Sequence, residues 1–252
     1  MHSLVLYNAP QSTCSQRVRF TLHEKGLAFS ELKLDLFSGD QLRPEYLKIN
    51  PNGVVPSLVH NGRVIIDSAV IIEYLSEVFP ESPPLVPHDA AERAAMRSLI
   101  RYIDEVPTPA VRVPSYNIAF LPHYRDMTEA DFVVLAESKP LRKEFLLSMG
   151  RTGFPAEEMN KALERLRRAI LRMSETLRAS GGPWLMGPDL TLADIAMMPV
   201  LVRMDDLGLG TMWERLREVA RWLAAFRARP SYSKTFYFGS LLTEKYPDLK
   251  IS

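Results

Sequence analysis

The sequence contains only one cysteine, Cys14, among its 252 residues. A single thiol cannot form a disulfide within the chain, and dithiol redox chemistry needs two closely spaced cysteines. The start of the chain also lacks the basic residues and the long apolar run of a secretory signal. We therefore expect a cytoplasmic protein in which Cys14 is a free thiol.

Several other features are absent. The 31 basic residues are balanced by 30 acidic ones, so the net charge gives no reason to expect a nucleic-acid partner or an acidic membrane surface. Apolar runs such as "IAMMPVLV" are far shorter than the roughly 20 residues that span a bilayer. The five histidines are scattered, which argues against a metal site, and "NPNGVVP" lacks the lysine and repeated glycines of a phosphate loop. We expect no membrane segment, no metal and no nucleotide.

The first eighty residues mix strand and helix patterns. The apolar run "LVLY" is typical of a buried strand, and a helix capped by Ser12 or Ser15 follows it as far as Gly26. The stretch "AFSELKLDL" alternates as a second strand, which the right-handed crossover rule places parallel to the first. After a polar helical stretch, Asn61 and Gly62 predict an antiparallel hairpin.

A further helix should follow this hairpin. Asp67 or Ser68 can cap its start, and the spacing predicts a buried face of five residues: Val70, Ile71, Tyr74, Leu75 and Val78. The order of elements is then βαβα followed by ββα, which predicts an α/β first domain over residues 1–80.

The segment "PESPPLVP" carries four prolines in eight residues, which predicts a stiff linker over residues 81–90. The remainder, residues 91–252, has helical periodicity and predicts an all-α bundle. Thr191 and Asp194 form a capping-box pattern at the start of one of its helices. The less regular zone from Pro107 to Pro155 is expected to be a helical insertion, a mobile cover, or both.

The hydroxyl and thiol cluster at residues 12–15 begins the first helix. Its free N–H groups and the helix dipole favour an anion, and a thiolate is the anion that this cluster suits, whether it belongs to Cys14 or to a ligand. The alternative is that Ser12 and Ser15 only cap the helix and that Cys14 is a small packing residue.

Two further features of the first half predict a peptide-like ligand. A cis bond before Pro56 would turn the backbone of Val55 outward, where its N–H and C=O can pair with an extended ligand. Asp67 and Ser68 would offer an acidic side chain, a hydroxyl and free amides to the ligand's charged groups.

With these motifs, the chain resembles a glutathione transferase. The resemblance covers nearly the whole sequence through "STCSQRVRF", "INPNGVVPSL", "DSAVIIEYL" and "LTLADIAMMP". It implies a thioredoxin-like first domain, an all-helical second domain that carries the acceptor site, a homodimer, and glutathione as co-substrate. It also implies that Val55 pairs with the cysteinyl backbone of glutathione, that Asp67 and Ser68 hold its γ-glutamyl group, and that Gln41 reaches its glycine carboxylate.

Three residues, Ser12, Cys14 and Ser15, stay open as the one that activates the thiol. The motif "STCSQRVR" is similar to that of zeta-class enzymes, in which the first serine bonds the glutathione thiolate; this position is Ser12 here. The irregular insertion and "RTGFPAEEM" resemble the bacterial β-aryl-ether-cleaving branch, which favours Ser15. We expect conjugation of glutathione to a hydrophobic or aromatic electrophile. The alternatives are reductive chemistry that uses Cys14, and a non-catalytic protein whose pocket is filled.

Overall fold

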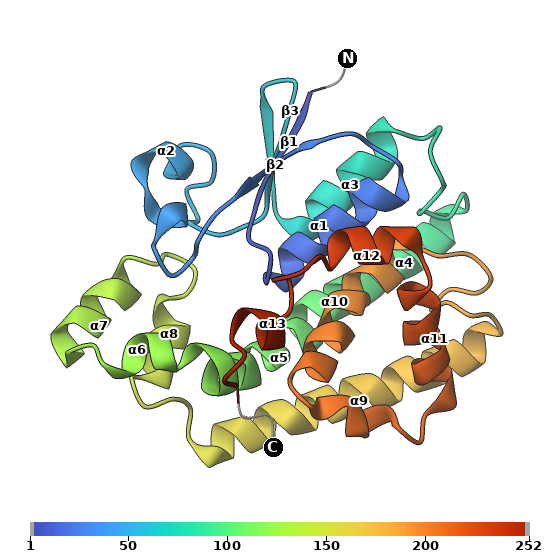
Figure 1. Ribbon diagram of the computed structural model, residues 1–252. Helices are drawn as coiled ribbons and strands as arrows, with labels where there is room; N and C mark the ends of the chain where they lie inside the picture. Colours follow the sequence, from blue (N-terminus) through green and yellow to red (C-terminus); the bar gives the residue numbers. More distant parts are fainter. Residues whose placement is uncertain (1–2, 250–252) are drawn as a thin grey trace.

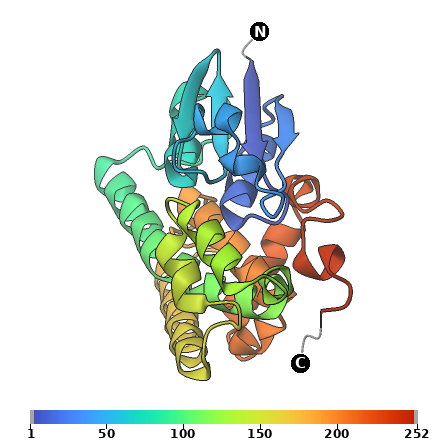
Figure 2. The same ribbon diagram turned by 90° about the vertical axis from the view of Figure 1, so that its left-hand side faces the viewer.

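The computed structural model describes residues 3–249, which form a sheet domain and a helical domain (Figure 1). Turning the molecule by 90° shows the sheet domain at one end and the long helices of the second domain below it (Figure 2). Within the described residues, no helix combines the length and the apolar character needed to cross a bilayer.

The sheet domain contains four strands in the order β2-β1-β3-β4. Strand β1 pairs parallel with β2 and antiparallel with β3, which in turn pairs antiparallel with β4. This arrangement confirms the predicted order of βαβα and ββα units. In chain order the elements are β1 (Leu4–Asn8), α1 (Thr13–Glu24), β2 (Ser30–Lys33), η1 (Asp40–Leu42), α2 (Pro44–Leu47), β3 (Ser57–His60), β4 (Arg63–Ile66) and α3 (Ser68–Val78).

Local chemistry explains where these elements begin and turn. Ser12 is the N-cap of α1, and Asp67 is the N-cap of α3, where its Oδ1 accepts bonds from two backbone amides. Asn61 and Gly62 both have positive φ angles, 50° and 80°, as a tight hairpin turn requires. The hairpin and both helix starts were predicted correctly, and Ser12 is the cap of α1 instead of Ser15.

Two sequence predictions in this domain are wrong in detail. Val70 and Val78 of α3 are 54% and 37% exposed, whereas Ile71, Ile72 and Leu75 are buried. The helix buries only the narrow face that meets α1 and the sheet, and periodicity cannot select between neighbouring apolar rows. The second strand covers only Ser30–Lys33, because it is a short edge strand paired on one side.

The helical domain begins after an extended connection over residues 79–89, which includes the proline-rich segment; the boundary at 81–90 remains a sequence-based prediction. Its helices pack around α10, which is buried along most of its length. The elements are α4 (Ala90–Glu105), α5 (Pro107–Ser115), η2 (Tyr116–Phe120), α6 (Pro122–Arg125), α7 (Glu129–Glu137), α8 (Lys143–Met149), α9 (Ala156–Ser180), α10 (Leu192–Asp206), η3 (Leu209–Trp213), α11 (Arg217–Arg227), α12 (Pro230–Thr235) and α13 (Leu242–Lys245). The irregular zone from Pro107 to Pro155 is therefore helical.

One core runs through both domains, and a buried arginine ties them together. The core cluster contains side chains from the sheet, from α1 and α3, and from α4, α9, α10 and α11. Arg17 of α1 is buried and donates from Nε to the Ala196 carbonyl at 3.0 Å and from Nη2 to Thr108 Oγ1 at 2.9 Å, and it also pairs with Asp104. The start of α1 is thus held rigidly against the helical domain.

Candidate active site

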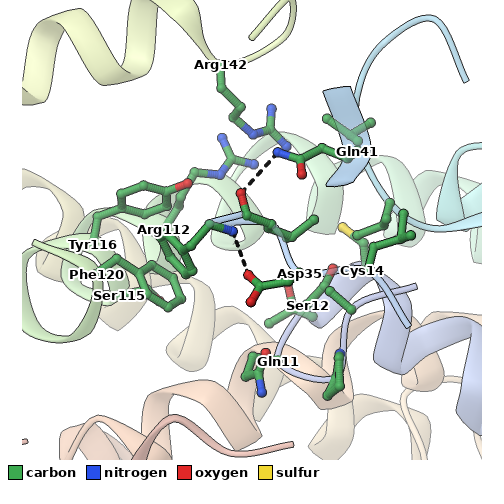
Figure 3. A pocket seen from close by; sticks show the side chains of 18 of the residues that line it. Gln11, Ser12, Cys14, Asp35, Gln41, Arg112, Ser115, Tyr116, Phe120 and Arg142 are labelled. Atoms are coloured by element: carbon green, nitrogen blue, oxygen red, sulfur yellow. Dashed lines mark hydrogen bonds between the residues drawn. The ribbon is translucent and has the colours of Figure 1, made fainter. Parts of the chain in front are cut away.

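A cavity of about 400 Å³ lies where the start of α1 meets the helical domain. Its walls come from the loops after β1 and β2, the loop before β3, the α5 and η2 helices, and the C-terminal segment. Figure 3 shows Ser12 and Cys14 on one side and Arg112, Tyr116 and Phe120 on the other. Both domains therefore contribute to one site.

Ser12 has the geometry of a hydroxyl that can hold a thiolate. Its side chain lines the cavity, and its Oγ accepts the Ser15 backbone N–H at 3.2 Å. A hydroxyl that accepts one bond still has its own proton to donate. The α1 N-terminus adds a positive partial charge beside that proton, so an anion in front of Ser12 is favoured.

Cys14 and Ser15 differ in their access to the cavity. Cys14 is a free, partly exposed cysteine whose side chain lines the wall. Ser15 is fully buried, is not part of the wall, and accepts the Ala9 backbone N–H at 3.3 Å. The structure brings Ser12 and Cys14 together on the cavity, and a contact of Ser15 with glutathione remains a prediction that this placement does not support.

The backbone at Val55 is open to a ligand. The Val55–Pro56 bond is cis, as expected from the sequence, and Val55 lines the cavity. Within residues 3–249, neither the N–H nor the C=O of Val55 has a hydrogen-bond partner. The neighbouring Val54 carbonyl is instead bound by Tyr46 Oη at 2.6 Å and Asn50 Nδ2 at 2.9 Å. These bonds hold the loop in place, and the Val55 N–H and C=O remain free to pair with a ligand.

Gln41 lies on the cavity wall and is only 4% exposed. Its Nε2 donates to the Leu36 carbonyl at 3.2 Å, and its Oε1 is buried with no partner among the described residues. A buried acceptor without a partner suits a ligand N–H group. A glycine carboxylate would instead need Nε2 to leave Leu36.

Asp67 and Ser68 stand at the start of α3, outside the cavity wall. The Asp67 carboxylate accepts the backbone amides of Ala69 at 2.9 Å and Val70 at 3.2 Å. The Ser68 hydroxyl accepts a long bond of 3.4 Å from the guanidinium of Arg17. Their predicted contact with the γ-glutamyl group stays a prediction.

An aromatic wall covers the helical side of the cavity. Phe37 lies 5.2 Å from Phe120, centroid to centroid, and stacks on His123 at 3.8 Å. Tyr116 and Phe120 come from η2, where the Leu121 N–H bonds the Tyr116 carbonyl at 2.8 Å in a π-helical turn. Such turns are frequent at functional sites. The wall suits an aromatic or otherwise apolar ligand.

The C-terminal segment closes one end of the site. Asp206 of α10 accepts the Leu242 backbone N–H at 2.6 Å and the Thr243 hydroxyl at 2.7 Å. The buried Arg203 lies within 4.0 Å of Asp206 and donates to Ser115 Oγ at 3.2 Å and to the Gln11 carbonyl. Tyr246 of this segment lines the cavity, and burial raises its pKa to about 12. The phenol is therefore neutral near neutral pH.

Cationic side chains on the cavity are the feature that the sequence-based reasoning missed. Arg112, Arg142 and Arg203 line it, together with three lysines: Lys33, Lys139 and Lys245. Burial lowers the pKa of Arg203 to about 10, and it lowers that of Arg112 to about 10 with a further contribution from Arg142. Arg203 could have been noticed as the single charge in the apolar run "IAMMPVLVRM". No motif in the irregular zone identified Arg112 or Arg142 as residues of a site.

Comparison with known proteins gives the family. Residues 6–83 match the sequence family described as glutathione S-transferase, N-terminal domain, and residues 156–229 match glutathione S-transferase, C-terminal domain. Glutathione S-transferase 1 of Dianthus caryophyllus is 32% identical over 197 residues, which cover 78% of this chain and 75% of that protein. The chain belongs to the glutathione S-transferase family, whose members are transferase enzymes.

Two further relatives correspond to the two resemblances noted in the sequence, one to zeta-class enzymes and one to the β-aryl-ether-cleaving branch. A zeta-class glutathione S-transferase of Euphorbia esula is 27% identical over 246 residues, 97% of this chain and 92% of that protein. Protein LigF of Sphingobium sp. (strain NBRC 103272 / SYK-6) is 30% identical over 241 residues, 93% of each chain. The crystal structure of the β-etherase LigF from Sphingobium sp. strain SYK-6 matches with a TM-score of 0.82 at 29% identity, covering 92% of this chain and 98% of that chain. The predicted fold, a thioredoxin-like domain followed by a helical domain, is confirmed.

Proposed function

We propose that the protein binds glutathione in this cavity and uses Ser12 to hold its sulfur as a thiolate for attack on a hydrophobic or aromatic electrophile. The observation that carries the proposal is the Ser12 hydroxyl, which accepts the Ser15 N–H at 3.2 Å and has its proton left for a ligand on the cavity side. Family membership supports glutathione as the ligand.

The reaction that we propose is a substitution or addition at carbon. The thiolate sulfur forms a bond to the electrophilic carbon, and in a substitution the leaving group departs with the electron pair of the bond that breaks. The proton lost by the glutathione thiol goes to solvent, so no oxidant or reductant is needed. Val55 would hold the cysteinyl backbone of glutathione as one strand holds another, and the aromatic wall would hold the acceptor.

The test is steady-state conjugation of glutathione to 1-chloro-2,4-dinitrobenzene by wild type and Ser12→Ala. The variant should lose about ten- to hundredfold in kcat, the effect of one lost hydrogen bond to a charged group. Thr128→Ala is a matched control, because Thr128 also caps a helix through its side chain, at α7 and off the cavity wall. An unchanged rate in Ser12→Ala would refute the role of Ser12.

A second candidate function uses Cys14 in reductive chemistry, and it is favoured by the position of that thiol on the cavity wall. The glutathione thiolate would first displace the leaving group from carbon. The Cys14 thiolate would then attack the glutathione sulfur, break its bond to carbon, and leave that carbon to take a proton. A second glutathione would reduce the mixed disulfide and yield glutathione disulfide.

The relative described as a β-etherase makes an aryl ether the natural test substrate for this second function. The second function would be favoured if Cys14→Ser lost ether cleavage while calorimetry showed that it still binds glutathione. Retained cleavage in that variant would exclude it. The third hypothesis, a non-catalytic protein, predicts a filled pocket, and the open cavity of about 400 Å³ argues against it.

We also propose a cytoplasmic homodimer that acts in detoxification, as the family resemblance implies. The side chains of Val64 on β4 and of Val70 and Val78 on α3 are apolar and exposed, which supports self-association through these elements. Analytical ultracentrifugation of the wild type and of Val70→Glu would test the dimer. A monomeric wild type would refute it.

A further inference from the structure

Two arginines of the cavity wall have no carboxylate partner among the residues that the structure describes. Arg112 lies on α5, and Arg142 immediately precedes α8. Among residues 3–249, the contacts of Arg112 include a ring contact with Phe145 at 5.5 Å but no carboxylate, and Arg142 donates only to the Leu141 carbonyl at 2.9 Å. Figure 3 shows Arg142 reaching into the cavity with Arg112 beside it.

The three buried arginines among the described residues, in contrast, have carboxylate partners. Each has a carboxylate within 4.0 Å: Arg17 has Asp104, Arg19 has Glu31, and Arg203 has Asp206. A guanidinium removed from water needs a counter-ion, because desolvation disfavours its charge. The fold provides that ion for these three arginines, one of which, Arg203, also lines the cavity, but within the described residues it provides none for Arg112 and Arg142.

The two carboxylates on the wall are already engaged elsewhere. Asp40 pairs with Arg43 at 2.8 Å and accepts the Asp35 backbone N–H at 2.8 Å. Asp35 accepts the backbone N–H groups of Phe37 at 2.9 Å and Ser38 at 3.2 Å. Neither carboxylate contacts Arg112 or Arg142 within the part of the chain that the structure describes.

Tyr116 adds a neutral donor beside the two cations. Burial raises the pKa of its phenol, while Arg142 and Arg112 act in the opposite direction without reversing the shift. The hydroxyl is therefore protonated near neutral pH and can donate a hydrogen bond to an anion. Two guanidinium groups and one phenol are a donor set that matches the two oxygens of a carboxylate.

We propose that Arg112 and Arg142 bind a carboxylate on the acceptor substrate, whose apolar part packs against Phe120. The acceptor is then an aromatic or unsaturated electrophile that carries an acid group. This inference rests on the proposed function, because the carboxylate belongs to the molecule that the glutathione thiolate attacks in the same cavity. Arg112, Tyr116 and Phe120 belong to consecutive elements, α5 and η2, which places the anion site and the aromatic wall together.

Glutathione carries a competing carboxylate on its glycine, which the proposed pose directs toward Gln41. The experiment therefore uses two acceptors that share one ring and one leaving group but differ in whether the acid group is charged: 4-chloro-3-nitrobenzoate and its methyl ester. In both, the glutathione sulfur forms the C–S bond and chloride leaves with the electron pair of the C–Cl bond. The uncatalysed rates, measured with glutathione and each acceptor but without protein, correct the enzymatic rates for the different reactivity of the two rings.

Wild-type protein should accelerate the reaction of the acid more than that of the ester. Arg112→Gln and Arg142→Gln should each lower kcat/KM for the acid by about ten- to hundredfold, as expected for a lost hydrogen bond to a charged group. The ester should change by less than about twofold, and glutathione affinity by calorimetry should stay the same. Arg165→Gln, on an exposed part of α9, removes the same charge elsewhere and should change neither substrate.

The other outcomes overturn the inference in distinguishable ways. If both variants weaken glutathione binding and slow acid and ester equally, the arginines bind the glycine carboxylate. If the wild type binds glutathione and conjugates the ester without preferring the acid, the anion site is refuted and the proposed function stands. If it binds no glutathione and conjugates neither acceptor, the proposed function fails, and this inference fails with it.

Discussion

The buried carboxylate of Asp194 gives the sharpest prediction about what holds the helical domain together. Its Oδ1 accepts the Leu185 N–H and the Trp222 indole N–H, both at 2.8 Å. Its Oδ2 accepts the Thr191 N–H at 3.0 Å and the Thr191 hydroxyl at 2.9 Å. One side chain thus caps α10 and connects it to α11 and to the preceding loop.

Asp194→Asn keeps the shape and replaces one acceptor oxygen with a donor. With Nδ2 in place of Oδ2, the buried Thr191 N–H loses its acceptor, while the Thr191 hydroxyl can turn and accept from the amide. The opposite orientation would leave both the Leu185 and the Trp222 N–H groups without an acceptor, so it is disfavoured. One unsatisfied buried donor costs about 1–3 kcal/mol, and the free energy of unfolding should fall by about that amount. This loss is substantial against the 5–15 kcal/mol typical of a folded domain.

The assay is urea denaturation followed by circular dichroism, with Asp205→Asn as the control. Asp205 lies on the same helix and pairs with Arg227, but both side chains are exposed by 40% or more. An exposed ion pair contributes about 0–1 kcal/mol, so this variant should stay close to wild type. Equal losses in the two variants would refute the account of Asp194.

Three further predictions concern other parts of the molecule. Burial raises the pKa of Glu24, but the hydrogen bonds from Arg229 and Ser231 outweigh it and hold the pKa below its usual value. The stabilisation is therefore present above about pH 4.3 and is lost as the pH falls through the folded-state pKa. Glu24→Gln should cost about 1–3 kcal/mol at neutral pH, and the difference from wild type should shrink in acid denaturation series; a constant difference would contradict this. Gly182→Ala should cost about 1–3 kcal/mol in thermal melts, because its Cβ would lie 2.1 Å from the Gly187 carbonyl oxygen, and an unchanged Tm would count against the packing described. Phe120→Ala should raise KM for an aromatic acceptor by about three- to tenfold without changing glutathione affinity, and an equal effect on both would show that the ring does not belong to the acceptor side.

Much of the sheet domain could be predicted because its signals are local. The Ser12 cap, the Asn61 and Gly62 turn and the Asp67 cap depend on residues that are neighbours in the chain. The face of α3 was predicted less well. Val70 and Val78 fit the helical period, yet the helix lies against its neighbours along the face of Ile71 and Ile72.

For the same reason, only the sheet-domain side of the candidate site could be predicted from the sequence. Ser12, Cys14 and Val55 stand in recognisable motifs, whereas Arg112 and Arg142 meet only because α5 and the segment before α8 pack on the same cavity. Their sequence neighbours show no periodicity that points inward. Such a site depends on tertiary packing, which a single sequence does not reveal.

The most direct test of the central claim is the pKa of the glutathione thiol in the binary complex, measured by thiolate absorbance in wild type, Ser12→Ala and Thr128→Ala. A cysteine thiol in water has a pKa of about 8.5. We predict a lower pKa in wild type and in the Thr128→Ala control, and a pKa higher by about one to two in Ser12→Ala, the equivalent of one lost hydrogen bond to a charged group. The same thiol pKa in wild type and Ser12→Ala would contradict the account.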